Sequence, residues 1–111
     1  MKNYIQPGHV LGVLAPGPIA SGSGVVVGAL FGVAAHPAEA GEIVQIHTVG
    51  VYALSKVPAE AWAIGDPIYW NATDSIATGV ATDNRLIGAA AEVAGAQEGI
   101  GAVRLNGAAV A

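Results

Sequence analysis

The sequence predicts a mainly β fold, a small β-barrel or sandwich-like single domain with at most one short helix. Three observations lead to this prediction. Apolar and polar residues alternate with a period of two in several short segments, which is typical of half-buried strands. Clusters of Gly, Pro, Asn and Asp separate these segments. The chain has 111 residues, which is enough for one domain with one core and too few for two ordinary domains.

The first half of the chain contains five predicted strands. They lie at Val10–Leu14, Gly24–Val27, 30–35, 42–47 and 49–53. In the fourth, Val44 and Ile46 should face the core while His47 points the other way, because successive side chains alternate between the two faces of a strand. In the fifth, Gly50 could mark a β-bulge. The Pro- and Gly-rich segment 15–24 is predicted to be a surface loop.

The second half of the chain contains four more predicted strands and the only predicted helix. The strands lie at 66–71, Ile76–Thr78, 86–93 and 99–105. The polar residues at 71–75 should form the tip of a hairpin between the first two. The helix is predicted at 58–63, because Pro58 suits the first turn of a helix and Glu60 favours its positive end. Gly65 should stop it.

Charge and composition exclude several classes of function. Charged residues make up 11% of the chain and hydrophobic residues 53%, whereas about 25% of residues are charged in a typical soluble domain. So few charges cannot cover a monomer's surface in the usual way, and part of that surface is expected to be buried against a partner. The four bases, Lys2, Lys56, Arg85 and Arg104, do not cluster, and the formal net charge is −4. Nucleic acid is therefore not expected as a partner.

Other features concern the environment of the protein. The chain has no Cys, which excludes disulfides and Cys-based zinc sites. The longest apolar run, 25–35, is interrupted by Gly28 and Gly32 and falls short of the roughly 20 residues that span a bilayer. The residues after Lys2 do not resemble a secretory signal. We expect a protein that is made in the cytoplasm and has no membrane partner.

The histidines are candidate metal ligands. His9, His36 and His47 are the only imidazoles, and Glu39 or Glu42 could add a carboxylate. None of the histidines has the close pair spacing of a zinc-binding helix, and His47 falls on the polar face of its predicted strand. We therefore expect solvated histidines, and no metal or other cofactor.

The Gly/Ser run at 21–24 is a candidate phosphate cradle or nucleophile loop, because glycines let backbone amides approach an anion. It lacks the Lys and Ser/Thr of a P-loop, and Ala20 stands where a Gly-x-Ser-x-Gly elbow has its first Gly. The carboxylates lie mostly next to turns rather than in pairs. No catalytic residue is predicted, since a small hydrolase would need scattered His and Asp residues to converge in one pocket.

The aromatic residues support two interpretations. Trp62, Tyr69 and Trp70 could form a sugar-stacking platform, or they could fill the core of a small β domain. Because Tyr69 and Trp70 are adjacent on a strand, they must face opposite sides, so we expect one of them in the core. Asp66 follows Gly65, and we expect its carboxylate to hydrogen-bond the tight turn before the strand rather than to act as a general base.

Several motifs occur in one order along nearly the whole chain. The central one consists of Trp62, Gly65, Asp66, Ile68, Tyr69 and Trp70, with Ser-Gly-Ser-Gly-Val-Val-Val-Gly at 21–28 before it and Leu-Ile-Gly at 86–88 and Val-Arg-Leu-Asn-Gly at 103–107 after it. In this order the motifs resemble those of the capsid cement proteins of tailed bacteriophages. Pro-Gly-Pro at 16–18 and His-Pro at 36–37 depart from the pattern and look like loop variation.

The resemblance implies a mainly β virion protein that performs no chemistry. Such a protein binds the outer surface of the phage head, often as a homotrimer near three-fold positions, and joins neighbouring subunits of the phage major capsid protein. It implies no cofactor, no nucleic acid and no membrane, and it places synthesis in the cytoplasm of the bacterial host.

The N-terminal residues are the predicted capsid contact. We divide the chain into an N-terminal arm at 1–8 and a single β-rich cement domain at 9–111. In the arm, polar and apolar residues alternate and could add a strand to a sheet edge on the shell; they are Lys2, Asn3, Tyr4, Ile5 and Gln6. The alternative function is a small β-barrel carbohydrate- or receptor-binding module with an exposed Trp.

Overall fold

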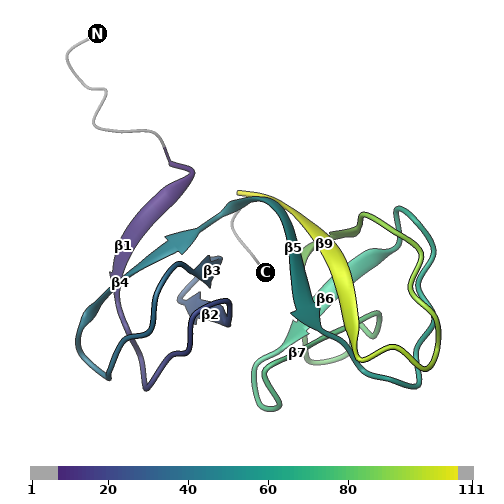
Figure 1. Cartoon of the computed structure of the whole chain (residues 1–111), viewed down its shortest axis with the longest axis horizontal. Helices are drawn as coiled ribbons and strands as arrows, with labels where there is room; N and C mark the ends of the chain where they lie inside the picture. The colour runs from purple at the N-terminus through teal and green to yellow at the C-terminus, as the bar shows by residue number, and fades with distance from the viewer. Residues whose placement is uncertain (1–7, 108–111) are drawn as a thin grey trace, which may run out of the picture.

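The computed structural model describes residues 8–107, and the regular structure in this range is entirely β (Figure 1). The N-terminal sheet has the order β1-β4-β3-β2 and consists of β1 (Val10–Leu14), β2 (Gly24–Val27), β3 (Leu30–Ala34) and β4 (Ile43–His47). The C-terminal sheet has the order β5-β9-β8-β6-β7 and consists of β5 (Val49–Ser55), β6 (Pro67–Asn71), β7 (Ile76–Thr78), β8 (Arg85–Ala90) and β9 (Ile100–Asn106). In the described range, no helix is long and apolar enough to cross a membrane.

The N-terminal sheet curls around its own apolar face. Its strands pair antiparallel, and alternate residues point into the curl. The buried residues of this small core are Ala15, Val25, Ala34, Ala38, Val44 and Ile46. Outside the strands, Ile19 and Ala38 exchange backbone hydrogen bonds of 2.8 and 3.0 Å between N and O, which closes the open side of the curl.

The C-terminal sheet curls until its two edges meet. Lys56, directly after β5, forms a parallel bridge with Ala77 of β7, and the amide of Val57 donates to the carbonyl of Ala77 at 3.2 Å. The curl needs a local kink. On β8, the partners of Ile68 and Tyr69 are Gly88 and Leu86, so Ile87 between them is an extra residue, and such a bulge increases the local twist. The result is a small, almost closed barrel.

The two sheets are joined by one residue, Thr48, and packed through aromatic rings. The Thr48 side chain is buried, and its hydroxyl donates to the carbonyl of Gly8 at 2.7 Å. Phe31 of β3 meets Trp70 of β6 with 5.1 Å between ring centroids and an interplanar angle of 55°. This tilted contact places Phe31 in the larger core, inside the C-terminal sheet. Arg85 also donates a hydrogen bond across the junction to the carbonyl of Gly28.

The prediction of a mainly β, barrel- or sandwich-like fold is confirmed. The strands at Val10–Leu14, Gly24–Val27 and Ile76–Thr78 have their predicted bounds. The one predicted at 86–93 ends early, at Ala90, because Ala94 instead exchanges backbone hydrogen bonds with Trp62. Strand positions therefore followed from the apolar alternation, whereas strand ends depended on pairing with distant residues.

The helix predicted at 58–63 is wrong. The segment makes a single turn, in which the amide of Glu60 donates to the carbonyl of Val57 at 3.1 Å. At Trp62 the backbone is extended again. Six residues give too few hydrogen bonds to offset the unfavourable nucleation of a helix. The tertiary partners of Glu60 and Trp62 determine the local backbone instead.

The bulge proposed at Gly50 is also wrong, because the pairing of β5 with β9 runs without a register shift through Gly50 and Leu105. The glycine has another role. Its φ of +125° is a conformation that residues with a Cβ rarely adopt. The ring of Tyr52 lies 3.1 Å from where a Cβ on Gly50 would be, and the Tyr52 hydroxyl donates to the carbonyl of Val49 at 2.8 Å. Glycine at position 50 therefore lets the β5 backbone adopt this φ and leaves room for the Tyr52 ring.

Trp62 fills the end of the barrel because Gly101 leaves room for it. The indole is 3% exposed, and a Cβ on Gly101 would lie 2.3 Å from its Cζ3 atom. Two rigid groups, a strand backbone and a buried ring, meet there, so neither can move aside without disturbing the core.

We predict that Gly101→Ala destabilises the fold by about 1–3 kcal/mol through overpacking. Gly99→Ala is the matched control, since no atom lies within 4 Å of a Cβ placed there. Urea unfolding followed by Trp fluorescence measures both free energies of unfolding. Equal stability of the two variants would contradict the close contact between the Gly101 backbone and the Trp62 ring.

Candidate functional site

The most polar buried group of the described chain is the ammonium of Lys56, whose residue is 1% exposed. Its Nζ donates to three backbone carbonyls, those of Val57 at 3.0 Å, Gly95 at 3.1 Å and Glu98 at 3.1 Å. These bonds use all three of its protons. The same atom lies 5.7 Å from the centroid of the Trp62 ring, within cation–π range. The ammonium therefore fastens the loop between β8 and β9 to the point where the barrel closes.

Glu60 lies at the N–H edge of the same indole. Its Oε1 accepts from the Trp62 indole at 3.2 Å and from the Gly79 amide at 2.8 Å, while Oε2 accepts from the Thr78 hydroxyl. Burial by itself raises the pKa of Glu60, but the hydrogen bonds from Thr78, Gly79 and Trp62 and the nearby charge of Lys56 lower it, and the net shift is downward. The carboxylate thus acts as a hydrogen-bond acceptor that ties the end of β7 to the Trp62 segment.

The sequence analysis missed the role of Lys56, although a signal for it was present. Leu54 faces the core, and in a period-two pattern the residue two positions later lies on the same side. A lysine at that position must find several acceptors, because burying an unpaired charge is strongly unfavourable. The distant carbonyls that it finds could not be identified from the sequence.

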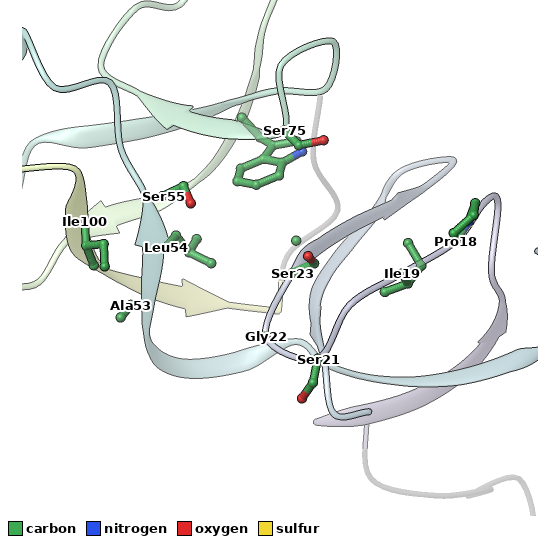
Figure 2. A pocket seen from close by; sticks show the side chains of 12 residues that line it. Pro18, Ile19, Ser21, Gly22, Ser23, Ala53, Leu54, Ser55, Ser75 and Ile100 are labelled. Carbon is green, nitrogen blue, oxygen red and sulfur yellow. The ribbon is translucent and has the colours of Figure 1, made fainter. Parts of the chain in front are cut away.

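A cleft of about 340 Å³ separates the Gly/Ser loop from the start of the barrel (Figure 2). Ser21 and Ser23 lie on one side, and Leu54 and Ser55 of β5 lie on the other, with Ser75 at one end. No described residue that lines the cleft has a titratable side chain. The cleft offers hydroxyls and backbone groups, and no described side chain that lines it can serve as a general acid or base.

The histidines occupy separate, mostly structural positions. His36 Nε2 accepts from the Gln45 amide at 3.2 Å, and its Nδ1 lies 3.1 Å from the Pro37 carbonyl, so the ring links a loop to β4. His47 stands beside Tyr52, with 6.2 Å between ring centroids. Among residues 8–107, no three His, Asp or Glu residues are grouped so that they could hold a metal ion.

The central motif lies across the Trp62 turn and β6. Both indoles are buried, with Trp62 3% and Trp70 5% exposed, so neither presents the open face of a stacking platform. Tyr69, on the opposite side of β6 from Trp70, is half-buried. Asp66 Oδ2 accepts from the amide of Ala63 at 2.9 Å, which is the turn-stabilising bond expected from the sequence.

The predicted capsid contact, from Lys2 to Gln6, lies outside the described residues. On the described surface, the sequence analysis missed two exposed apolar side chains, Leu14 on β1 and Ile43 on β4, which are direct cross-strand partners. The period-two pattern carried a signal for them. Since Val13 and Val44 face the core, their neighbours must face outward.

We predict that Glu60→Gln lowers the stability of the fold at neutral pH, and that this loss disappears in acid. A folded-state pKa below the ordinary value of 4.5 means that the ionised carboxylate stabilises the fold above that pH. This contribution is lost as the pH falls through the folded-state pKa. Urea midpoints should therefore be lower for Glu60→Gln than for the wild type at neutral pH, and the two should converge as the pH falls below 4.5.

The matched control for this prediction is Glu92→Gln, which removes an exposed carboxylate and makes the same change in charge. Its urea midpoints should follow those of the wild type throughout. A difference between Glu60→Gln and the wild type that stays constant down to pH 3 would contradict the proposed stabilisation by the ionised group.

Comparison with known proteins gives one informative result. The model of a protein family described as phage cement protein matches residues 5–105, which is most of the chain and includes both sheets almost completely. Neither the curated proteins nor the solved structures give a match. The match agrees with the resemblance carried by the motifs around Trp62, Trp70 and the closing strand. The chain belongs to the phage cement protein family, and its role is that of a structural protein associated with the phage capsid.

Proposed function

We propose that this protein binds the outside of the phage head as a homotrimer and bridges subunits of the major capsid protein. The observation that carries the proposal is the family match over residues 5–105. The composition supports it, because a chain with 11% charged residues is suited to burying part of its surface against a partner. The function is non-enzymatic, and synthesis takes place in the host cytoplasm.

The stabilisation would follow from mass action. A protein that binds the assembled shell but not its separate subunits shifts the equilibrium toward assembly. A trimer that engages several shell subunits at once gains avidity without stronger individual contacts. Such a protein acts only through its free energy of binding. A rigid fold that presents a fixed surface therefore serves this function better than a reactive site.

The N-terminal arm, residues 1–8, remains the proposed capsid contact, with the cement domain at 9–111. The arm ends at Pro7-Gly8, where the prolyl ring lacks an N–H donor and glycine allows a change of direction. The arm would therefore be separate enough from β1 to add a strand to a sheet edge on the shell.

The proposed function predicts saturable binding to mature heads that lack this protein. The purified chain is sedimented with such heads and with unexpanded precursor heads, and the thermal transition of the heads is followed by calorimetry. We expect saturation on mature heads, a higher head transition temperature and, by sedimentation equilibrium, a mass of three chains. Absence of binding to every head form would contradict the proposal.

Deleting residues 2–6 is predicted to weaken head binding at least tenfold, which corresponds to about 1.4 kcal/mol. The urea midpoint of the deleted chain should equal that of the full chain, because both described cores are built from residues between Leu11 and Leu105. Undiminished binding of the deleted chain would show that the capsid contact lies elsewhere.

A further inference from the structure

Charge is distributed unevenly between the two sheets. Between Gly8 and His47, the segment that forms the N-terminal sheet, Glu39 and Glu42 are the only Asp, Glu, Lys or Arg residues. The other charged residues of the described chain all belong to the C-terminal sheet and its loops; they are Lys56, Glu60, Asp66, Asp74, Asp83, Arg85, Glu92, Glu98 and Arg104. The centres of protein interfaces are depleted in charge, whereas water-facing surfaces are not. The N-terminal sheet therefore has the composition of a covered surface.

Strand β1 presents an open edge. It stands at the end of the strand order, and Figure 1 shows it (purple) on the side away from the C-terminal sheet. The amide of Ala15 donates to Glu42 O and that of Thr48 to His9 O, both at 2.8 Å. In an antiparallel pair, residues alternate between bonding toward and away from the partner strand. The amides of the even-numbered residues, Val10, Gly12 and Leu14, consequently point away from β4.

This edge carries none of the devices that usually keep a strand from pairing with another chain. Residues Val10–Leu14 include no Lys, no Pro and no charge, and their pairing with β4 has no bulge. Edges of this kind invite an additional strand unless something covers them. Within residues 8–107, no strand pairs with this side of β1.

The sheet face beside the edge is apolar. Leu14 is 61% and Ile43 56% exposed, and they are cross-strand partners at the end of β1. Glu42 follows in register, since its carbonyl accepts from the amide of Ala15. A strand added to β1 would therefore lie next to Leu14 near the end of β1, with Ile43 one strand further away on β4 and the exposed residues Glu39 and Glu42 beyond that end.

We propose that the β1 edge and this face, formed by Val10, Gly12, Leu14, Ile43 and Gln45, bind an extended, uncharged segment of the shell protein. A Lys or Arg at one end of that segment would pair with Glu39 and Glu42. This docking face rests on the proposed function, and it places the N-terminal sheet toward the shell and the charged barrel toward solvent.

The family match favours the shell over a second copy as the occupant, because it associates this protein with a phage capsid. Pairing of β1 with β1 of another copy would be isologous and would close as a dimer, which does not fit a three-fold assembly. The proposed arm is followed in the chain by His9 and β1, so the arm and the docking face are neighbours in sequence.

Ile43→Lys tests the docking face, and Ile100→Lys on β9, where the side chain is 61% exposed, is its matched control. Both changes place a charge at an exposed strand position, so both chains should fold, with urea midpoints close to that of the wild type. We expect the Kd for mature heads to rise at least tenfold for Ile43→Lys and to stay within twofold for Ile100→Lys.

Val10→Pro tests the edge separately. It removes one amide that points away from β4 and leaves the hydrogen bonds between the two strands in place. Head binding of this variant should weaken at least fivefold with an unchanged far-UV circular dichroism spectrum.

The outcomes separate the two proposals. If the wild type binds heads and all three variants bind equally well, the docking face is wrong and the proposed function stands. If the wild type binds no head form, both are wrong. If Ile43→Lys changes the mass of the protein in solution but not its affinity for heads, the face is a contact between copies, and the assignment to the shell is overturned.

Discussion

The closure of the C-terminal sheet around Trp62 is the constraint on which the rest of the structure depends. The inner face of this five-stranded sheet is buried because the sheet curls until its edges meet, at Lys56 and Ala77. The ammonium of Lys56 connects three backbone segments there, and the indole of Trp62 fills the space over Gly101. Burial of this lysine is tolerated because all of its protons are bonded. Its hydrogen bonds specify how far the sheet curls.

The barrel then determines how the N-terminal sheet is held. With β6 fixed by the curl, Trp70 projects from the core toward β3 and packs on Phe31, and Gly24 leaves room for the same indole. The β2–β3 side of the N-terminal sheet is therefore occupied by the barrel. Its β1–β4 side faces outward, with an open strand edge and few charges. One molecule thus combines a lobe that carries most of the charged residues with a lobe that has few of them and an open strand edge.

This division suits a protein whose task is attachment. A cement protein acts through the free energy of its contacts with the assembled head. An apolar surface that is unfavourable when exposed to water and favourable when buried against the head strengthens these contacts. The same surface would be a liability in a solitary monomer, since open apolar edges promote association with any available strand. In the described residues, the polar groups are used mainly for turns, bridges and closure.

The sequence by itself determined the fold class, most strand positions, the turn held by Asp66 and the family resemblance. These depend on local alternation, on turn-forming residues and on ordered motifs, all of which are properties of neighbouring residues. Tertiary structure decided the rest. Glu60 and Trp62 form no helix because their partners are Thr78, Gly79 and Ala94, distant in the chain. Likewise, the carbonyls that Lys56 bonds and the pairing of Leu14 with Ile43 depend on which segment lies beside which, and a period-two pattern alone does not specify that pairing.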